Sequence, residues 1–285
     1  MNVTFYGVRG STPCSCTNNR RYGGNTACVA IDIPGSEPIV LDLGTGLRFW
    51  GQDLPADRPF HGHALVTHLH WDHIQGLPFF APVLRPGSSL DVYAPADDSE
   101  ALAASFDEFM APPYFPVSVA DLPGQMSFHA VTDTRFTIGD VVVTARSVPH
   151  IGITNGYRIE HKGVVLAYIS DHQQPIDGGL EVTDEVIDLC RGADLLIHDA
   201  QYTSTEFETK AHWGHCTAEF AVAVAAQAGV RRLALFHHDP SHDDVMVDSI
   251  LIEARERAAR AGISEVIAAG EGLKVSVGTA SVVAR

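Results

Sequence analysis

The chain has 285 residues, of which 45% are hydrophobic and 19% are charged. A chain of about this size buries roughly three quarters of the surface of its unfolded form, so it can build a large core without disulfides. Its formal net charge of -16 disfavours broad binding of long nucleic acids, because an acidic body repels their phosphates. No stretch approaches the roughly 18 apolar residues of a membrane span, and the N-terminus lacks a signal-peptide pattern.

The five cysteines are odd in number and show no CxxC spacing. This pattern favours reduced thiols, and hence a cytoplasmic protein. Cys14 and Cys16 lie two residues apart and are possible metal ligands, although no second cysteine pair accompanies them. The chain has no internal repeat and no low-complexity linker, so we expect a single domain over residues 1–285.

The first half of the chain is predicted to begin with strands, since apolar runs alternate with glycine and proline. The predicted strands lie at residues 3–6, 27–33, 39–42, 64–67 and 90–94. An amphipathic helix is expected at 98–110. The prolines of segment 111–117 exclude regular structure there, and Tyr114 and Phe115 in it are either a plug of the core or a lid over a nearby site.

The second half is predicted to contain two hairpins, followed by alternating helices and strands. The hairpin strands lie at 135–138 with 141–148 and at 156–160 with 164–169. The later helices lie at 183–190, 217–228 and 244–261, and the later strands at 194–197, 233–236, 265–268 and 273–277. Helices and strands mixed in this way predict a layered α/β protein.

Residues 68–73 read His-Leu-His-Trp-Asp-His, directly after the predicted strand at 64–67. On an extended backbone His68 and His70 point to the same side, so both imidazoles can reach one ion. Asp72 and His73 follow where the chain turns, and can be directed at a second point a few ångströms away. Three imidazoles and one carboxylate suit zinc, or manganese or iron where oxygen donors are more numerous.

Other candidate ligands follow other predicted strands. His150 comes after the strand at 141–148, and Asp171 after the strand at 164–169. The strand at 233–236 runs into His237 and His238. Because an α/β scaffold gathers its functional groups at strand ends, these side chains are expected to converge with residues 68–73 on a two-metal site.

The hexapeptide resembles the HxHxDH signature of the metallo-β-lactamase superfamily. Segments 148–150, 156–159, 194–200 and 214–218, together with residues 235–237, resemble its ribonuclease Z-like phosphodiesterase branch. The resemblance implies a four-layer αβ/βα sandwich, classed as α/β, with a metal site at its rim. It also implies that Asp42 supports the metal loop from behind the ligands.

Carried over by position, the resemblance implies two divalent ions, most readily zinc. It implies the ligand set His68, His70 and His150 for one ion, Asp72, His73 and His237 for the other, and Asp171 between them. His238 is the less favoured alternative to His237. The ions would hold a hydroxide that attacks phosphorus, with Asp72 in the catalytic centre. His215 would protonate the leaving group, and Asp199 would orient His215.

The expected substrate is a small phosphodiester, such as a cyclic nucleotide, a cyclic sugar phosphate or a short oligonucleotide. Ribonuclease Z enzymes carry a long arm that grips tRNA, and no segment of this chain resembles it. The motif around Asp171 also reads Ser-Asp-His, where related enzymes usually have Gly-Asp-Thr. The alternatives are a lactone, lactam or thioester hydrolase of the same fold and a non-catalytic metal-binding sensor. A homodimer is expected from similar proteins.

Overall fold

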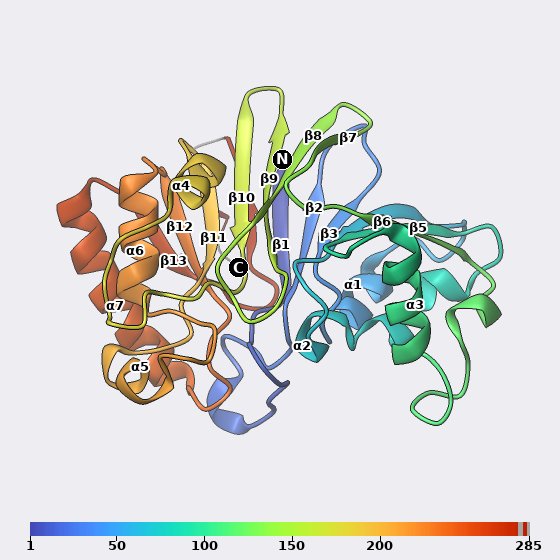
Figure 1. The fold of residues 1–285 in the computed structure, drawn as a ribbon, viewed down its shortest axis with the longest axis horizontal. Helices are drawn as coiled ribbons and strands as arrows, with labels where there is room; N and C mark the ends of the chain where they lie inside the picture. Colours follow the sequence, from blue (N-terminus) through green and yellow to red (C-terminus); the bar gives the residue numbers. More distant parts are fainter. Residues whose placement is uncertain (279–281, 284–285) are drawn as a thin grey trace.

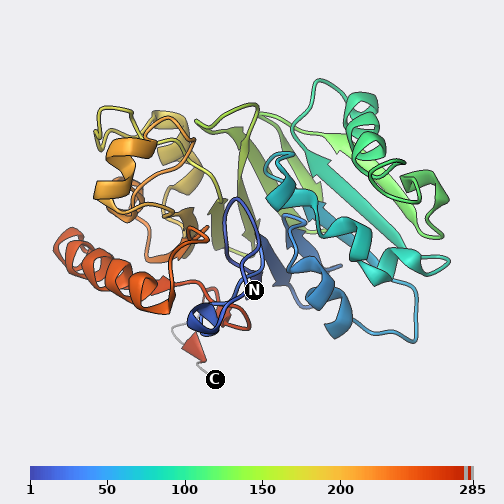
Figure 2. The ribbon, with the colours of Figure 1, turned by 90° about the horizontal axis from the view of Figure 1, so that it is seen from below.

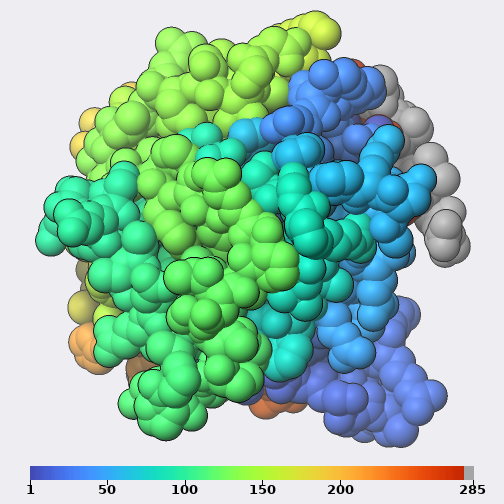
Figure 3. Space-filling view, turned by 90° about the vertical axis from the view of Figure 1, so that its right-hand side faces the viewer, coloured from blue at the N-terminus to red at the C-terminus, as the bar shows by residue number. Residues whose placement is uncertain are grey.

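The computed structural model describes residues 1–278 and 282–283 of the chain. Two β-sheets face each other, and helices cover the outer face of each sheet (Figures 1 and 2). The four layers are the predicted αβ/βα sandwich. Figure 3 shows that the face on the α3 side is formed mainly by the first half of the chain.

The first sheet has eight strands in the order β15-β14-β1-β2-β3-β4-β5-β6. Strands β3 to β6 are mutually parallel, whereas β14, from the end of the chain, pairs antiparallel with β1. Their bounds are β1 (Asn2–Gly7), β2 (Cys28–Asp32), β3 (Ile39–Leu41), β4 (His61–Leu65), β5 (Ser89–Ala94), β6 (Gln125–Ala130), β14 (Lys274–Ser276) and β15 (Val282–Val283). Helices α1 (Leu47–Asp53) and α3 (Ser99–Phe109) pack on its outer face.

The second sheet has seven strands in the order β13-β12-β11-β10-β9-β8-β7, and β10 to β13 are parallel. Their bounds are β7 (Arg135–Ile138), β8 (Val141–Ser147), β9 (Asn155–His161), β10 (Val164–Ile169), β11 (Leu195–Asp199), β12 (Arg232–Phe236) and β13 (Glu265–Ala268). Its outer face carries α4 (Asp184–Cys190), α6 (Ala218–Gln227) and α7 (Asp244–Ala261). The short helix α5 (Ser204–Lys210) lies between β11 and α6 in the chain.

The core is divided by the two sheets into three apolar layers. The middle layer lies between the sheets and includes Phe5, Ile31, Tyr168 and Phe236. Parallel strands covered on both faces read as continuous apolar runs, and all five residues of β11 are buried. This packing fixes the strand ends, and therefore the loops that follow them.

Strand β4 does not occupy its predicted range. It spans His61–Leu65 rather than 64–67, so Thr67 lies outside the ladder. The carboxylate of Asp42 accepts hydrogen bonds from the Thr67 backbone N–H at 2.7 Å and from its hydroxyl at 3.0 Å. His68 and His70 therefore lie after the strand, in the segment that leads into α2 (Trp71–Ile74). The predicted strand therefore ends two residues early, where the Asp42 carboxylate takes the Thr67 N–H in place of a sheet partner, but the backbone at His70 is extended and the rings of His68 and His70 lie in one group.

Several other expectations can be compared directly with the structure. Helix α7 has its predicted bounds, and the Thr217 hydroxyl caps α6 by accepting from the Phe220 backbone N–H at 3.1 Å.

Phe115 packs edge-on against Phe79, with ring centroids 6.1 Å apart, while Tyr114 is 81% exposed. The lid role of this segment stays a prediction. Within the described residues, none of the helices has both the length and the apolar character of a membrane-spanning helix.

Candidate metal centre

The predicted ligands converge at the edge of the sheets where α2 lies (Figure 1). His68, His70, Asp72 and His73 come from the segment that follows β4 in the eight-stranded sheet. The seven-stranded sheet supplies the others from the ends of three strands, with His150 after β8, Asp171 after β10 and His237 after β12. Parallel strand ends facing across the sandwich bring the two sets together.

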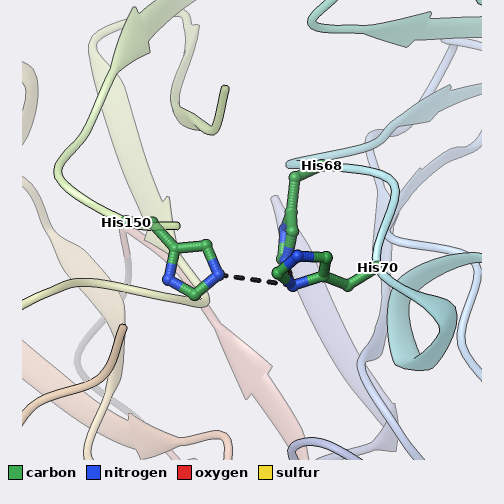
Figure 4. A group of neighbouring side chains, drawn as sticks. All are labelled: His68, His70 and His150. Carbon is green, nitrogen blue, oxygen red and sulfur yellow. Dashed lines mark hydrogen bonds between the residues drawn. The ribbon is translucent and has the colours of Figure 1, made fainter. Parts of the chain in front are cut away.

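The first group consists of His68, His70 and His150, whose side chains point toward one another (Figure 4). His68 Nε2 lies 2.9 Å from His70 Nδ1, and His150 Nε2 lies 3.4 Å from the same His70 atom. Three ring nitrogens facing one point from three directions are the donor set of a divalent ion such as zinc.

The second group consists of Asp72, His73 and His237, all buried. Asp72 Oδ2 lies 3.2 Å from His73 Nε2 and 3.2 Å from His237 Nε2. The two imidazole nitrogens are 3.3 Å apart. This group joins helix α2 to the end of β12 and mixes nitrogen with oxygen donors.

Asp171 lies between the two groups. Its Oδ1 is 3.8 Å from His150 Nε2 and 3.5 Å from His237 Nε2, and its Oδ2 is 3.2 Å from His73 Nε2. Oδ2 is buried and has no hydrogen-bond partner within the described residues. A buried carboxylate oxygen without a hydrogen bond is unfavourable unless a cation satisfies it, so the position suits the predicted bridging ligand.

The structure distinguishes the neighbouring histidines at the end of β12. His237 faces the centre, whereas His238 Nε2 donates to the backbone oxygen of Ala269 at 2.9 Å. The alternative ligand His238 is therefore directed elsewhere. His237 has φ = 59°, a left-handed conformation that is uncommon for a residue other than glycine.

Oxygen atoms lie behind four of the five ligand imidazoles. Asp42 Oδ2 accepts from His73 Nδ1 at 2.9 Å, and the backbone oxygen of Gly214 accepts from His150 Nδ1 at 2.6 Å. Gln201 Oε1 accepts from His237 Nδ1 at 2.8 Å, while the Thr67 hydroxyl lies 3.1 Å from His68 Nδ1. Each contact leaves the Nε2 lone pair directed at the centre, which is how proteins orient metal-binding histidines.

Close backbone approach at two glycines also shapes the centre. A Cβ on Gly214 would lie 2.6 Å from the His150 ring, and a Cβ on Gly10 would lie 2.3 Å from His237 Nδ1. Gly214 also has φ = 91°, which only glycine adopts readily. Any larger residue at either position would displace a ligand ring.

The buried charges at the centre shift one another strongly. At His73, burial lowers the pKa, but the carboxylates of Asp72 and Asp171 outweigh it and hold the pKa well above its usual value. Burial raises the pKa of Asp72, and the facing His73 outweighs it, so the net pKa lies well below its usual value. Ionised carboxylates that favour a positive charge on these rings would equally favour a divalent cation, which would take the place of the proton when it binds.

His215, the expected proton donor, lies beside the candidate ligands. Its Nδ1 is 3.1 Å from Asp199 Oδ2 and 3.6 Å from Asp171 Oδ1. Its ring stacks on that of His237, with centroids 5.0 Å apart. Asp199 is fully buried and also accepts from the His172 backbone N–H at 3.0 Å, so its carboxylate is held in place.

Two residues that sequence reasoning missed complete the surroundings. Gln201 is 2% exposed and connects His237 to Ser11, whose hydroxyl accepts from Gln201 Nε2 at 3.3 Å. The Ser11 backbone N–H donates to Asp72 Oδ2 at 2.7 Å, and Ser11 has φ = 61°. The only sequence signal for Gln201 is its place two residues after Asp199 at the end of β11.

A cavity of about 420 Å³ opens over the centre. It is lined by Ser11, Leu69 and Trp71 together with the centre residues His70, Asp72, Asp171 and His215. Cys14 and Cys16 line a second cavity, of about 740 Å³, that shares no lining residue with the first. All five cysteines are free thiols.

The fold and the chain's sequence agree with those of known proteins. The family model described as Beta-lactamase superfamily domain matches residues 39–238. A ribonuclease Z of Synechococcus sp. (strain CC9311) is 28% identical over 305 residues, covering 89% of this chain and 93% of that protein. The metallo-beta-lactamase fold protein YhfI from Bacillus subtilis has a TM-score of 0.72 at 20% identity, covering 96% of this chain and 98% of that one. A diphosphatase of the PhnP family has a TM-score of 0.68 at 19% identity, covering 96% and 97%.

A sandwich of this kind with histidine and aspartate groups at its edge is typical of metal-dependent hydrolases. The chain belongs to the beta-lactamase superfamily, and its sequence is that of a ribonuclease Z-like member. The His/Asp clusters are suited to divalent metal ions. The distribution of ligands between two ions stays a prediction.

Proposed function

We propose that this hydrolase cleaves a phosphodiester bond in a small substrate. The observation that carries the proposal is His215, which lines the cavity beside the candidate ligands and is oriented by the buried Asp199. Because Nδ1 of His215 donates to Asp199 Oδ2, Nε2 of its imidazolium form is the atom left to give a proton to a leaving alkoxide. Such a donor accelerates the departure of an unactivated alkoxide.

Two divalent ions, which we propose are zinc, would supply Lewis acidity and lower the pKa of a bound water. His68, His70 and His150 would hold one ion and Asp72, His73 and His237 the other, with Asp171 between them. Nitrogen-rich donor sets of this kind favour zinc. The carboxylate of Asp72 lies on the cavity wall, where it can accept a hydrogen bond from the attacking water and orient it.

Two observations support a small substrate rather than tRNA or another long nucleic acid. The cavity of about 420 Å³ lies in the range of small-molecule sites. The formal charge of -16 repels extended phosphate backbones outside the centre. Phosphorus chemistry itself is supported by one protein of similar sequence and one of similar structure. The similar Synechococcus protein is a ribonuclease Z, and the PhnP-family neighbour is a diphosphatase. The homodimer and the cytoplasmic location stay predictions.

The test compares leaving groups across variants. Purified wild type, His215→Ala and the control His212→Ala, which changes an exposed neighbouring histidine, are analysed for metal and assayed on bis(p-nitrophenyl) phosphate and on a dialkyl phosphate. We expect His215→Ala to keep its metal and to lose roughly 10²- to 10⁴-fold on the dialkyl ester, with a smaller loss on the nitrophenyl ester, whose leaving group needs no proton.

Two outcomes would contradict the proposal. Equal rates for wild type and His215→Ala on the dialkyl ester would remove His215 from proton transfer. Faster hydrolysis of a lactone or thioester than of any phosphodiester would assign the enzyme to acyl transfer instead.

A further inference from the structure

Trp71 is an exposed indole within the candidate metal centre. It lies between His70 and Asp72, lines the cavity, and is 76% exposed. Burying a large apolar side chain contributes about 1.5–3 kcal/mol, so this indole has surface left to bury against a ligand. Trp50, by contrast, is 4% exposed and stacks on Phe80 in the core.

The backbone of Trp71 is held in place by hydrogen bonds of neighbouring residues. The backbone N–H of His73 donates to His70 O, and that of Gln75 donates to Trp71 O, so the first turn of α2 is closed. Both residues that flank Trp71 belong to the candidate ligand groups. The backbone that carries the indole is therefore held beside the candidate ligands, as the support of a binding platform must be.

The other cavity walls offer little to discriminate one phosphodiester from another. Among the described residues that line the cavity, none is Lys or Arg. The metal ions and His215 would recognise the phosphate, which every phosphodiester has. Leu69 and Trp71 are the apolar lining residues, and of these only the indole offers a π-face.

From these contacts we propose that Trp71 stacks on an aromatic base of the substrate, which makes the substrate a nucleotide phosphodiester rather than a sugar phosphodiester without a base. This inference rests on the proposed phosphodiester function and narrows its substrate class. Stacking of a base on an aromatic side chain is tolerant of base identity, so we expect little preference among the four bases.

The experiment measures binding of two product analogues to zinc-loaded protein by calorimetry. Adenosine 5′-monophosphate and ribose 5-phosphate share the phosphate and the sugar and differ by the base. We expect Trp71→Ala to weaken binding of the adenosine compound between about 5-fold and 150-fold, with less than about a 2-fold effect on ribose 5-phosphate. Trp71→Phe, which keeps an aromatic face, should retain most of the affinity.

Trp213 provides the matched control. It is 61% exposed and does not line the cavity, so Trp213→Ala should leave both affinities unchanged. The protein has three tryptophans, so quenching of fluorescence by the nucleotide should be lost in Trp71→Phe and kept in Trp213→Phe. Trp71 is exposed, and its replacement should not affect folding.

The outcomes separate this inference from the function on which it rests. Equal loss for both ligands in Trp71→Ala, no loss for either, or no binding of the adenosine compound to wild type would overturn the stacking role. Hydrolysis of bis(p-nitrophenyl) phosphate in that case would leave the phosphodiesterase function standing. Hydrolysis of lactones or thioesters in preference to phosphodiesters would overturn both.

Discussion

Individual residues behind the ligands determine which nitrogen each imidazole presents. Gln201 is the clearest case, because its amide oxygen accepts from His237 Nδ1 while its amide nitrogen contacts Ser11 and Tyr202. The backbone of His237 is also in the left-handed conformation, with φ = 59°. Gln201 therefore fixes the orientation of the His237 ring at the end of β12.

Replacing Gln201 should therefore weaken metal binding without removing a ligand. Gln201→Leu loses the acceptor for His237 Nδ1, and we expect a roughly 10- to 100-fold loss in zinc affinity. The measurement is competition with a chromogenic chelator. Gln201→Glu keeps an oxygen at that position and serves as the control. Equal affinity in the Leu variant and wild type would show that His237 orients itself without Gln201.

At the scale of elements, capping sets where the loops near the centre begin and end. Helix α5 was not predicted, although the sequence Thr203-Ser-Thr-Glu206 is a capping box. Thr203 donates its backbone N–H and its hydroxyl to Glu206 Oε2, both at 2.8 Å, and His242 Nε2 donates to Glu206 Oε1 at 2.8 Å. Glu206 thus joins α5 to the segment between β12 and α7.

Glu206 should make stability depend on pH. Burial raises its pKa, but hydrogen bonds from Thr203 and His242 outweigh burial and lower the folded-state pKa below the usual value of about 4.5. A lowered folded-state pKa stabilises the protein above the unfolded value, and this contribution is lost as the pH falls through the folded value. We expect Glu206→Gln to reduce the free energy of unfolding by about 1 kcal/mol at pH 7.

Urea unfolding of both proteins over a series of pH values measures this effect. The difference should shrink as the pH falls below about 4.5, where Glu206 becomes neutral in the unfolded chain and then in the folded one. A difference that stays constant down to pH 3 would mean that the charge of Glu206 is not the source.

At the scale of the whole molecule, each candidate ligand group draws on both sheets. His68 and His70 follow β4 of one sheet, while His150 follows β8 of the other; Asp72 and His237 are divided in the same way. Bound ions would therefore link the two halves of the sandwich at one edge. A ligand that binds only the folded state stabilises it by mass action.

Removal of metal should accordingly lower thermal stability. At free zinc about 100 times the dissociation constant, the bound ion contributes about 2.7 kcal/mol, and a chelator should abolish that contribution. For a chain of this size, a shift of several degrees in Tm is expected. The shift should return when zinc is added back, and it should be smaller in His237→Ala. Identical Tm values with and without chelator would contradict a metal link between the sheets.

Much of the fold and of the centre followed from patterns local in the chain. Apolar runs with glycine and proline between them predicted most strands, and α7 had the expected bounds because its caps are sequence signals. Helix α1 and strand β6 were missed, since α1 begins without a side-chain cap and β6 is exposed enough to lack a continuous apolar run. The end of β4 was misplaced because Asp42, 25 residues away from Thr67, competes for its backbone.

The sequence alone determined the chemical character of the centre, because donor types and their order after strand ends are written in the chain. The resemblance carried by the sequence already favoured His237 over His238 and paired Asp199 with His215, whereas only the tertiary structure turned His238 toward Ala269 and placed Gln201 behind a ligand. These outcomes depend on which strand ends meet across the two sheets. These contacts are set by packing between segments that are far apart in the chain. Asp72 and His237, for example, are separated by 165 residues, and no local pattern encodes their contact.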